Sequence, residues 1–376
     1  MTMLLAVVRA AGTPHEIGRA YGRAAARAVV ANLDRYLARF AQVGLDRDTV
    51  RAQGERFGAT TRRRLPRVAA MVEGVAAAVD RPAAELYALN ARTELLFGAT
   101  RDGCTAVGLS GERRPGVGAG ALLAQNWDWS PAQAESMLLL ETRDERGHAT
   151  LGLVEAGMLA KAGLNSAGIG VCVNVMASAR DGEPGGVPYH LILRAILEST
   201  TFAGAALAAA GLPRSASLNV LVGAATGELV DLELAPGAVD WTWPHDGALA
   251  HANHFEACAG IEDRLLALAP LAASSRARAD RARALLASAS DADDLAAILR
   301  DHGGPHPICV HHDPSDPPER RTETLASLLL DLEARRLSIA VGPPCRAPYQ
   351  ALALGSSPSD ANARSTLPVM RATSVP

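Results

Sequence analysis

The pattern of apolar residues changes once along this chain of 376 residues, and the change falls at residues 98–110. Before this segment, apolar residues recur at helical spacing in successive stretches, and no convincing long strand is found. After it, short apolar runs alternate with Gly, Pro and charged turns, a pattern typical of antiparallel strands. A helical block is therefore expected first, followed by a β-rich remainder.

Four helices are predicted in the first block, after a short strand within residues 1–9. Thr13 and Glu16 form a capping-box pattern around Pro14, which opens the first helix, and Gly44 ends it. Pro66 and Pro82 open the third and fourth in the same way. The expected helices cover 14–44, 48–62, 66–79 and 82–98.

The remainder is predicted to contain two blocks of strands with helices between them. Helices are expected at 188–200, 202–210, 262–287 and 292–301. Strands are expected at 105–110, 119–126, 136–142, 149–155, 166–175, 217–225, 228–234, 238–243, 248–254, 323–332 and 336–341. This order indicates an α+β fold in which two mainly antiparallel sheets stack face to face between helical layers. Residues 355–376 are rich in Ser, Pro, Asn and Ala and predict a disordered tail.

Composition limits the partners and the compartment. An apolar content of 48% with 20% charged residues describes a soluble globular chain, and a net charge of −3 argues against nucleic acid or an anionic membrane as a partner. The first residues carry one short apolar run without a basic segment before it, which is too weak for a secretory signal. The five cysteines are widely spread with no C-x-x-C, which favours a reduced cytoplasmic chain over a disulfide framework or a zinc cluster.

Cys104 is the strongest candidate for a chemical role. If the peptide bond between Gly103 and Cys104 were cut, one residue would carry both a thiol and a primary amine. An α-amine titrates at about 7.7–8.0 and can accept the thiol proton, so the pair forms a complete nucleophile and base. Gly103 favours such a cut, because glycine tolerates the strained backbone that exposes its carbonyl to the next side chain. The alternative is a buried structural cysteine.

Six short motifs follow one another along the chain. They are NARTE at 90–94, DGCT at 102–105, QNWDW at 125–129, ANHF at 252–255, IC at 308–309 and GPPC at 342–345. In this order they resemble the acyl-coenzyme A:6-aminopenicillanate (isopenicillin N) acyltransferase family, the peptidase C45 group of cysteine N-terminal-nucleophile hydrolases. The likeness covers about residues 12–350, and the 24-residue step from Cys104 to Asp128 fits the family.

The resemblance implies an αββα fold and a zymogen that cleaves itself between Gly103 and Cys104. The expected products are a helical alpha chain, 1–103, and a beta chain with its core at 104–354, which stay associated. Family members transfer or hydrolyse acyl groups held in amide or thioester linkage, without a metal or a redox cofactor. The expected partner is therefore a small-molecule amide or acyl thioester. Whether the chain forms a homo-oligomer is left open.

Hydrolysis of a small N-acyl or peptide-like amide is favoured among the functions considered. The alternatives are coenzyme A-dependent N-acyl transfer at the same site, a non-catalytic αββα binding protein, and an uncleaved Cys/His hydrolase with His254 as its base. Val310 stands where the penicillin-making fungal members have an arginine that partners the aspartate matched by Asp128, and this departure argues against the coenzyme A reaction. Arg92 and Arg346 are the arginines considered as substitutes.

Three further residues are assigned to the catalytic site. Asn253 is expected in the oxyanion hole, since a neutral amide donates to a developing charge, a contact typically worth about 2.7–4 kcal/mol; the alternative is an Asn that satisfies local backbone at a strand end. Asp128 is expected to orient the α-amine or to anchor an arginine, the alternative being a surface turn. Thr105 is expected to donate near the nucleophile, although it is also simply a good strand residue.

Substrate-binding or supporting roles are expected for Asn126, Trp127, Arg92 and Glu94. Arg92 and Glu94 are two positions apart, so on one helix at most one of them faces the site. No metal site is expected. His302 and His306 have the i,i+4 spacing of a helical metal pair, but the Gly-Gly-Pro between them cannot hold a helix.

Overall fold

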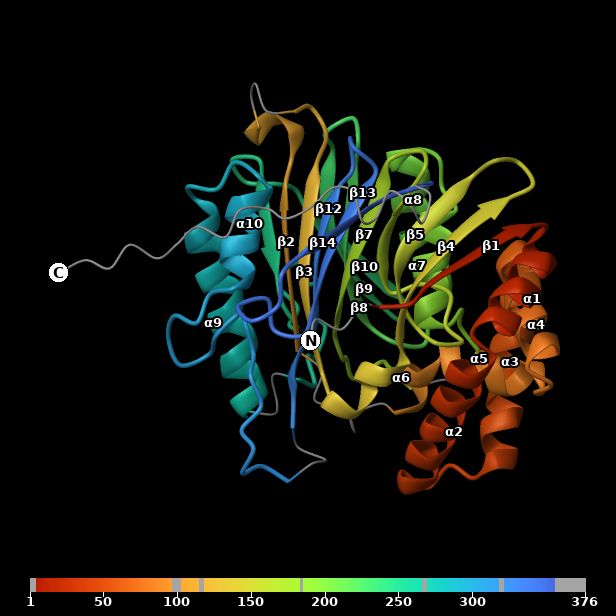
Figure 1. Cartoon of the computed structure of the whole chain (residues 1–376). Helices are drawn as coiled ribbons and strands as arrows, with labels where there is room; N and C mark the ends of the chain where they lie inside the picture. Colours follow the sequence, from red (N-terminus) through yellow and green to blue (C-terminus); the bar gives the residue numbers. More distant parts are fainter. Residues whose placement is uncertain are drawn as a thin grey trace.

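Two β-sheets lie face to face with helices on both outer sides (Figure 1). The computed structural model describes residues 5–96, 103–114, 118–182, 185–265, 269–317 and 321–355. The predicted tail therefore lies outside the described residues, apart from residue 355. The α+β sandwich expected from the sequence is confirmed.

The first sheet has eight strands, and neighbouring strands are antiparallel except for the first pair, which is parallel. In spatial order they are β1 (Val7–Gly12), β4 (Met137–Asp144), β5 (Ala149–Glu155), β6 (Ala162–Asn165), β7 (Ile169–Val175), β8 (Leu218–Ala224), β9 (Leu229–Ala235) and β10 (Ala238–Thr242).

The second sheet has six strands, all paired antiparallel. In spatial order they are β11 (Ala248–His251), β2 (Gly103–Leu109), β3 (Leu122–Trp129), β12 (Glu323–Asp331), β13 (Arg336–Val341) and β14 (Gln350–Ala353). Strand β2, which begins at the predicted cleavage site, is thus flanked by β3 and β11.

Helices cover the outer face of each sheet. One apolar cluster joins the outer side of the eight-stranded sheet to α1 (Pro14–Ala24), α2 (Ala26–Gln42), α3 (Arg47–Arg64), α4 (Pro66–Ala78), α5 (Ala83–Asn90), α6 (Arg92–Leu95), α7 (Tyr189–Leu197) and α8 (Phe202–Ala210), of which α3 lies against α4 and α5. The six-stranded sheet packs against α9 (Ala269–Leu286) and α10 (Ala292–Leu299). Apolar side chains fill three layers as a result, one between the sheets and one under each helical cover.

The capping signals predicted the starts of several helices correctly. Thr13 caps α1, and Glu16 completes the capping box. The prediction of a single helix over 14–44 is wrong, however, because the chain breaks at Ala25 into α1 and α2. Ala25 is neither glycine nor proline, so no local signal marks the break.

Two strand predictions are also wrong in ways that affect the site. The strand predicted over 166–175 begins only at Ile169, because the preceding residues form a turn with Gly168 at φ +84°, and β6 before this turn was not predicted. The strand predicted over 248–254 ends at His251, so Asn253 and His254 lie in a loop. Strand β14 was not predicted.

Candidate active site

Cys104 is the second residue of β2 and is 3% exposed. It is paired with Trp127 of β3, and both side chains face the apolar layer between the sheets. The next residue, Thr105, points to the opposite face, because side chains alternate along a strand. There it meets α9. The start of β2 therefore presents the thiol to one side of the sheet and polar contacts to the other.

Asp128 lies directly opposite Gly103 across the β2–β3 pair. It is 1% exposed, so the alternative of a surface turn is wrong. Its Oδ1 accepts a hydrogen bond of 2.6 Å from Thr324 Oγ1, whereas its buried Oδ2 receives no hydrogen bond from the described residues. A Cβ at Gly103 would stand 3.1 Å from this Oδ2. Glycine thus leaves room for a carboxylate beside the predicted scissile bond.

Burial raises the pKa of Asp128 to about 6, although the charge of Arg278 and the bond from Thr324 act to lower it. This carboxyl group therefore titrates close to neutrality, where a group that exchanges protons in catalysis is most effective.

Asn253 holds the backbone nitrogen of Cys104. That N–H donates to Asn253 Oδ1 at 3.0 Å. The amide nitrogen of Asn253 donates in turn to the carbonyl of Val175 at 2.9 Å, and its backbone N–H donates to Ser275 Oγ at 2.7 Å. The same backbone nitrogen of Cys104 would become the α-amine after cleavage. In the uncleaved chain, then, Asn253 meets Cys104 as an acceptor, and the described residues use only one hydrogen of its Nδ2.

Arg278 of α9 joins these groups, and sequence reasoning missed it. It is 4% exposed and donates to Thr105 Oγ1 at 2.7 Å, to Asn253 Oδ1 at 2.8 Å and to the carbonyl of Cys104. Burial lowers the pKa of Arg278, while the negative charges of Asp128 and Cys104 oppose that shift. Helix α9 therefore supplies a buried positive charge next to Cys104.

Arg92 and Arg346 are the arginines considered as substitutes for the missing family arginine, but the arginine whose charge acts on Asp128 in the structure is Arg278. Arg92 donates to Glu155 Oε1 at 2.9 and 3.1 Å and lies over the ring of Trp129. Arg346 is exposed in the turn after β13. Arg278 carries no motif and is 174 positions from Cys104, so its role depends on a contact that only the tertiary structure reveals.

The supporting residues fall into two groups. Asn126, on the α10 side of β3, donates to the carbonyls of Leu299 and Ile308 at 2.8 and 3.0 Å, and so fastens a later loop to the site. Trp127 lies beside Cys104 with Lys161 over its ring at 4.0 Å.

Arg92 and Glu94 anchor the short helix α6. Arg92 pairs with Glu155 at the end of β5, and Glu94 accepts from the backbone N–H of Tyr189 at 2.6 Å. Burial raises the pKa of Glu94 to about 8. Their contacts tie α6 to β5 and α7, which is a scaffolding arrangement.

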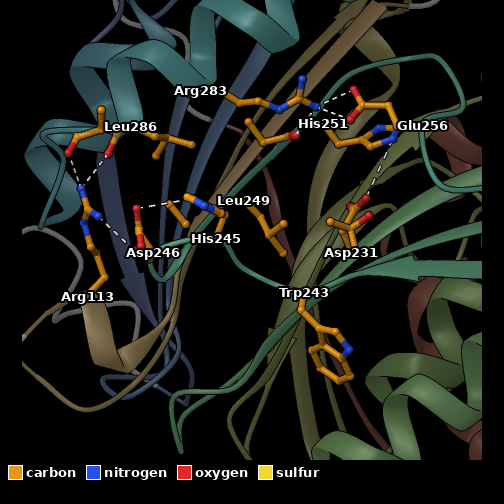
Figure 2. A pocket seen from close by; sticks show the side chains of 14 residues that line it. Arg113, Asp231, Trp243, His245, Asp246, Leu249, His251, Glu256, Arg283 and Leu286 are labelled. Carbon is orange, nitrogen blue, oxygen red and sulfur yellow. Dashed lines mark hydrogen bonds and ion pairs between the residues drawn. The ribbon is translucent and has the colours of Figure 1, made fainter.

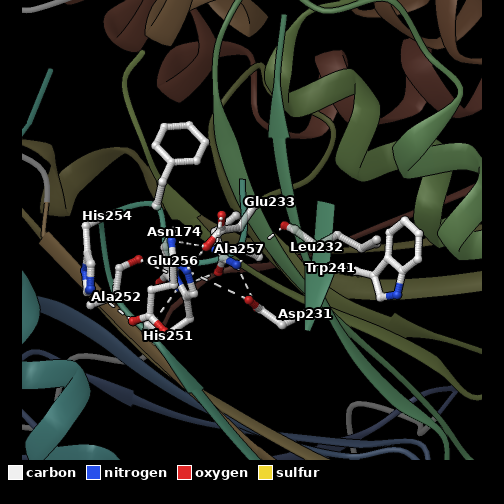
Figure 3. Close-up of polar contacts among 12 residues, drawn as sticks. Asn174, Asp231, Leu232, Glu233, Trp241, His251, Ala252, His254, Glu256 and Ala257 are labelled. Carbon is white, nitrogen blue, oxygen red and sulfur yellow. Dashed lines mark hydrogen bonds and ion pairs between the residues drawn. The ribbon is translucent and has the colours of Figure 1, made fainter. Parts of the chain in front are cut away.

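A buried network fixes the loop that carries Asn253 (Figure 3). Glu233 of β9 accepts the ring N–H of His251 at 2.9 Å and the backbone N–H groups of residues 256–258 at 2.6–2.9 Å. His254, in the same loop, contacts Ser275 Oγ at 2.8 Å and pairs with Glu256 at 3.0 Å. The conformation of the loop therefore depends on a carboxylate of the facing sheet.

Stability is expected to fall as the pH rises through about 9 because of this network. Burial acts to lower the pKa of His251, but Asp231 and Glu233 outweigh it and raise the pKa to about 9 from the usual 6.5. A raised histidine pKa stabilises the fold fully below about 6.5, and the contribution is lost as the pH rises through 9. Urea unfolding near pH 7 and near pH 10 tests this. The fall should be smaller in His251→Gln than in the wild type or in the exposed control His245→Gln.

A cavity of about 450 Å³ lies along β11 (Figure 2). Its lining includes the ion pair of Arg283 with Glu256, and Arg113, which donates to the carbonyl of Leu286 at 3.2 Å. Trp243 stands at its side, 60% exposed. Cys104 does not line this cavity, so we assign the cavity no part in the chemistry.

Two comparisons of sequence decide the family. A family profile described as acyl-coenzyme A:6-aminopenicillanic acid acyl-transferase matches residues 116–346. The chain is also 30% identical, over 346 residues, to the 40 kDa form of acyl-coenzyme A:6-aminopenicillanic-acid-acyltransferase from Emericella nidulans, covering 89% of this chain and 91% of that relative. The chain belongs to the acyl-coenzyme A:6-aminopenicillanic acid acyl-transferase family.

Membership of this acyl-transferase family confirms the resemblance predicted from the six motifs. It indicates an enzyme of the acyltransferase type. Solved structures similar to this acyl-transferase family member include the Caenorhabditis elegans ortholog of N-acylethanolamine-hydrolyzing acid amidase, 13% identical with a TM-score of 0.44 over 61% of this chain and 93% of that one. Another is penicillin V acylase from Agrobacterium tumefaciens, 12% identical with a TM-score of 0.44 over 67% and 86%. Among the described residues, no helix is both long and apolar enough to cross a membrane.

Proposed function

We propose that the protein is a self-processing cysteine amidase that hydrolyses a small N-acyl or peptide-like amide through a thioester on Cys104. The observation that carries the proposal is the position of the Cys104 backbone nitrogen, which is held 3.0 Å from Asn253 Oδ1 while Arg278 donates to the same oxygen. A nitrogen held this way stays next to its own thiol once it becomes an amine.

Self-cleavage begins when Cys104 Sγ attacks the carbonyl carbon of Gly103. The new C–S bond replaces the C–N bond, the nitrogen leaves as an amine after taking a proton, and water then hydrolyses the thioester to a Gly103 carboxyl group and a free thiol. Asp128 supports this step as the proton carrier, since its Oδ2 lies beside Gly103 and its pKa is about 6. Because Gly103 has no side chain, the Asp128 carboxylate can lie next to the scissile bond.

Turnover then uses the same groups. The α-amine accepts the thiol proton, the thiolate attacks the substrate carbonyl, and the amine returns the proton to the leaving nitrogen. Arg278 favours the thiolate through its buried charge, and Thr105 is a positioning residue because its hydroxyl accepts from Arg278. Asn253 keeps the amine in place, and the free hydrogen of its Nδ2 is assigned to the oxyanion. Water finally releases the acyl group.

Acyl transfer from coenzyme A is the second candidate. It is favoured by the 30% identical relative, which is named as an acyltransferase. It is opposed by Val310, which stands where the penicillin-making fungal members have an arginine.

A substrate panel on the cleaved protein distinguishes these candidates. Short N-acyl amides, small peptides and acyl-coenzyme A donors are each assayed with water alone and with an added amine acceptor. Release of free acid from an N-acyl amide supports the proposal, and amine-dependent consumption of acyl-coenzyme A without amide hydrolysis supports transfer. An unreactive Cys104 with no turnover of any substrate would support a binding protein instead.

The acidic limb of the pH–rate profile is expected to shift when Thr324 is replaced by valine. Asp128 has a folded-state pKa of about 6, so activity that needs its carboxylate falls as the pH drops through 6. The Thr324 hydroxyl stabilises the charged form, and its removal raises this pKa further. The acidic limb of the rate of self-cleavage should therefore move to higher pH in Thr324→Val and stay in place in Thr322→Val. An unchanged limb in both would remove Asp128 from the mechanism.

A further inference from the structure

Four metal-binding side chains meet at one point outside the candidate active site. They come from two segments that are 34 residues or more apart, and their ligand atoms all lie within 4.8 Å of one another. The set is His302, Cys309, His311 and Cys345. The sequence pattern suggested testing His302 with His306, but the structure groups His302 with His311 and two thiols.

Four of the six distances between these atoms fit a tetrahedral zinc site, and the other two are within 4.8 Å. With Zn–S bonds of about 2.3 Å and Zn–N bonds of about 2.0–2.1 Å, the tetrahedral edges are about 3.8 Å for S–S, about 3.5 Å for S–N and about 3.3 Å for N–N. The two sulfurs here are 3.7 Å apart, and the two histidine Nε2 atoms 3.1 Å. His311 Nε2 lies 3.6 Å from Cys309 Sγ and 3.2 Å from Cys345 Sγ.

We propose that these four residues bind one Zn²⁺ ion in a Cys₂His₂ site. Four protein ligands fill the coordination sphere and leave no open position, which is the pattern of structural rather than catalytic zinc. Mixed thiolate and imidazole ligands in tetrahedral array select zinc over magnesium or calcium, which prefer oxygen.

The backbone brings the ligands together without any helix. Cys309 N–H donates to the carbonyl of Asp301 at 3.0 Å, which closes the loop from 301 to 309, and Asp301 is held by Arg281 of α9 at 2.7 and 3.0 Å. Gly304 provides the turn with φ +78°. His302 and His306 do not form a pair, as expected from the Gly-Gly-Pro between them, and the loop presents His302 together with His311 instead.

The neighbouring histidines are not part of the set. His312 pairs with Glu323 at 2.7 Å, and His306 is absent from the cluster although it lies in the same loop. This selectivity gives the test a matched control, since His306 and His302 belong to one short stretch.

The proposed zinc site is connected to the candidate active site by one short chain of contacts. Val310 directly follows the ligand Cys309. Its N–H donates to Thr324 Oγ1 and its carbonyl accepts from the N–H of Thr324, both at 3.0 Å. The Thr324 hydroxyl donates in turn to Asp128. Asn126 donates to the carbonyl of Ile308 on the other side of Cys309. A bound ion therefore fixes the segment 308–310 against β3 and β12, where Asp128 is held.

Metal analysis of the full chain tests the proposal and does not depend on its activity. The protein is purified under reducing conditions, incubated with Zn²⁺, freed of excess metal, and measured by elemental mass spectrometry. About one zinc per chain is expected for the wild type and for His306→Ala, with a loss of most of the metal in Cys345→Ser and in His302→Ala. Both substituted ligands are exposed, so the variants are expected to fold.

Cobalt provides a second readout. Co²⁺ in place of zinc should give the absorption of a tetrahedral thiolate site in the wild type and in His306→Ala, and lose it in Cys345→Ser. A reduced wild-type chain that takes up no zinc, or equal metal content in Cys345→Ser and the wild type, would overturn the proposal. So would a Cys309–Cys345 disulfide in the isolated protein if the reduced chain still binds no metal.

Discussion

Replacing Cys104 by alanine is expected to abolish amide hydrolysis and to leave the chain in one piece. Both reactions begin with attack by the same sulfur, and loss of a catalytic nucleophile typically costs about 10⁴-fold or more in rate. Fold should be retained, because the side chain that replaces the thiol is smaller and the backbone N–H of residue 104 still bonds to Asn253. Denaturing electrophoresis and kcat/KM measure the two effects.

The control for this experiment is Cys258→Ala. Cys258 is likewise a buried cysteine, but it lies in the loop held by Glu233. This variant should cleave itself and turn over substrate like the wild type. Substantial hydrolysis by Cys104→Ala would mean that another group is the nucleophile.

Replacing Arg278 by alanine is expected to cost about 3 kcal/mol or more of unfolding free energy, because buried acceptors lose their charged donor and each such loss typically costs about 1–3 kcal/mol. The change removes the donors to Thr105, Asn253 and the carbonyl of Cys104, and takes a positive charge away from buried Asp128. Urea unfolding in a Cys104→Ala background measures the cost in a chain that cannot cleave itself.

Two further variants are compared with Arg278→Ala. Arg278→Lys keeps the charge but loses the planar fork that reaches several acceptors, so an intermediate loss is expected. Arg276→Ala changes an exposed arginine of the same helix and should cost less than about 0.5 kcal/mol. Equal stability of Arg278→Ala and Arg276→Ala would show that the hydrogen bonds of Arg278 contribute nothing to the fold.

Local patterns predicted the fold class because they depend on neighbouring residues. The capping box at Thr13 and the alternation after Cys104 report local backbone preference, and they located α1 and β2 well. Ala25 shows the limit of such signals. The break there has no local marker. Its position depends on tertiary packing, because α1 packs against α4 while α2 packs against other elements.

The candidate site divides in the same way. The pairing of β2 with β3 places Asp128 opposite Gly103, and both lie in motifs that the sequence singled out. Arg278 and Thr324 come from distant segments without motifs, so only the assembled sheet and α9 bring them to Asp128. The metal cluster was missed for a related reason, since its histidines and cysteines are presented by loops rather than by a regular element.

The most direct test of the central claim is the first residue of the larger fragment in active enzyme. Intact-mass measurement and N-terminal sequencing of freshly purified wild-type protein should find a second chain that begins Cys-Thr-Ala-Val, at residues 104–107. Full activity in a preparation that contains a single uncleaved chain would contradict the mechanism.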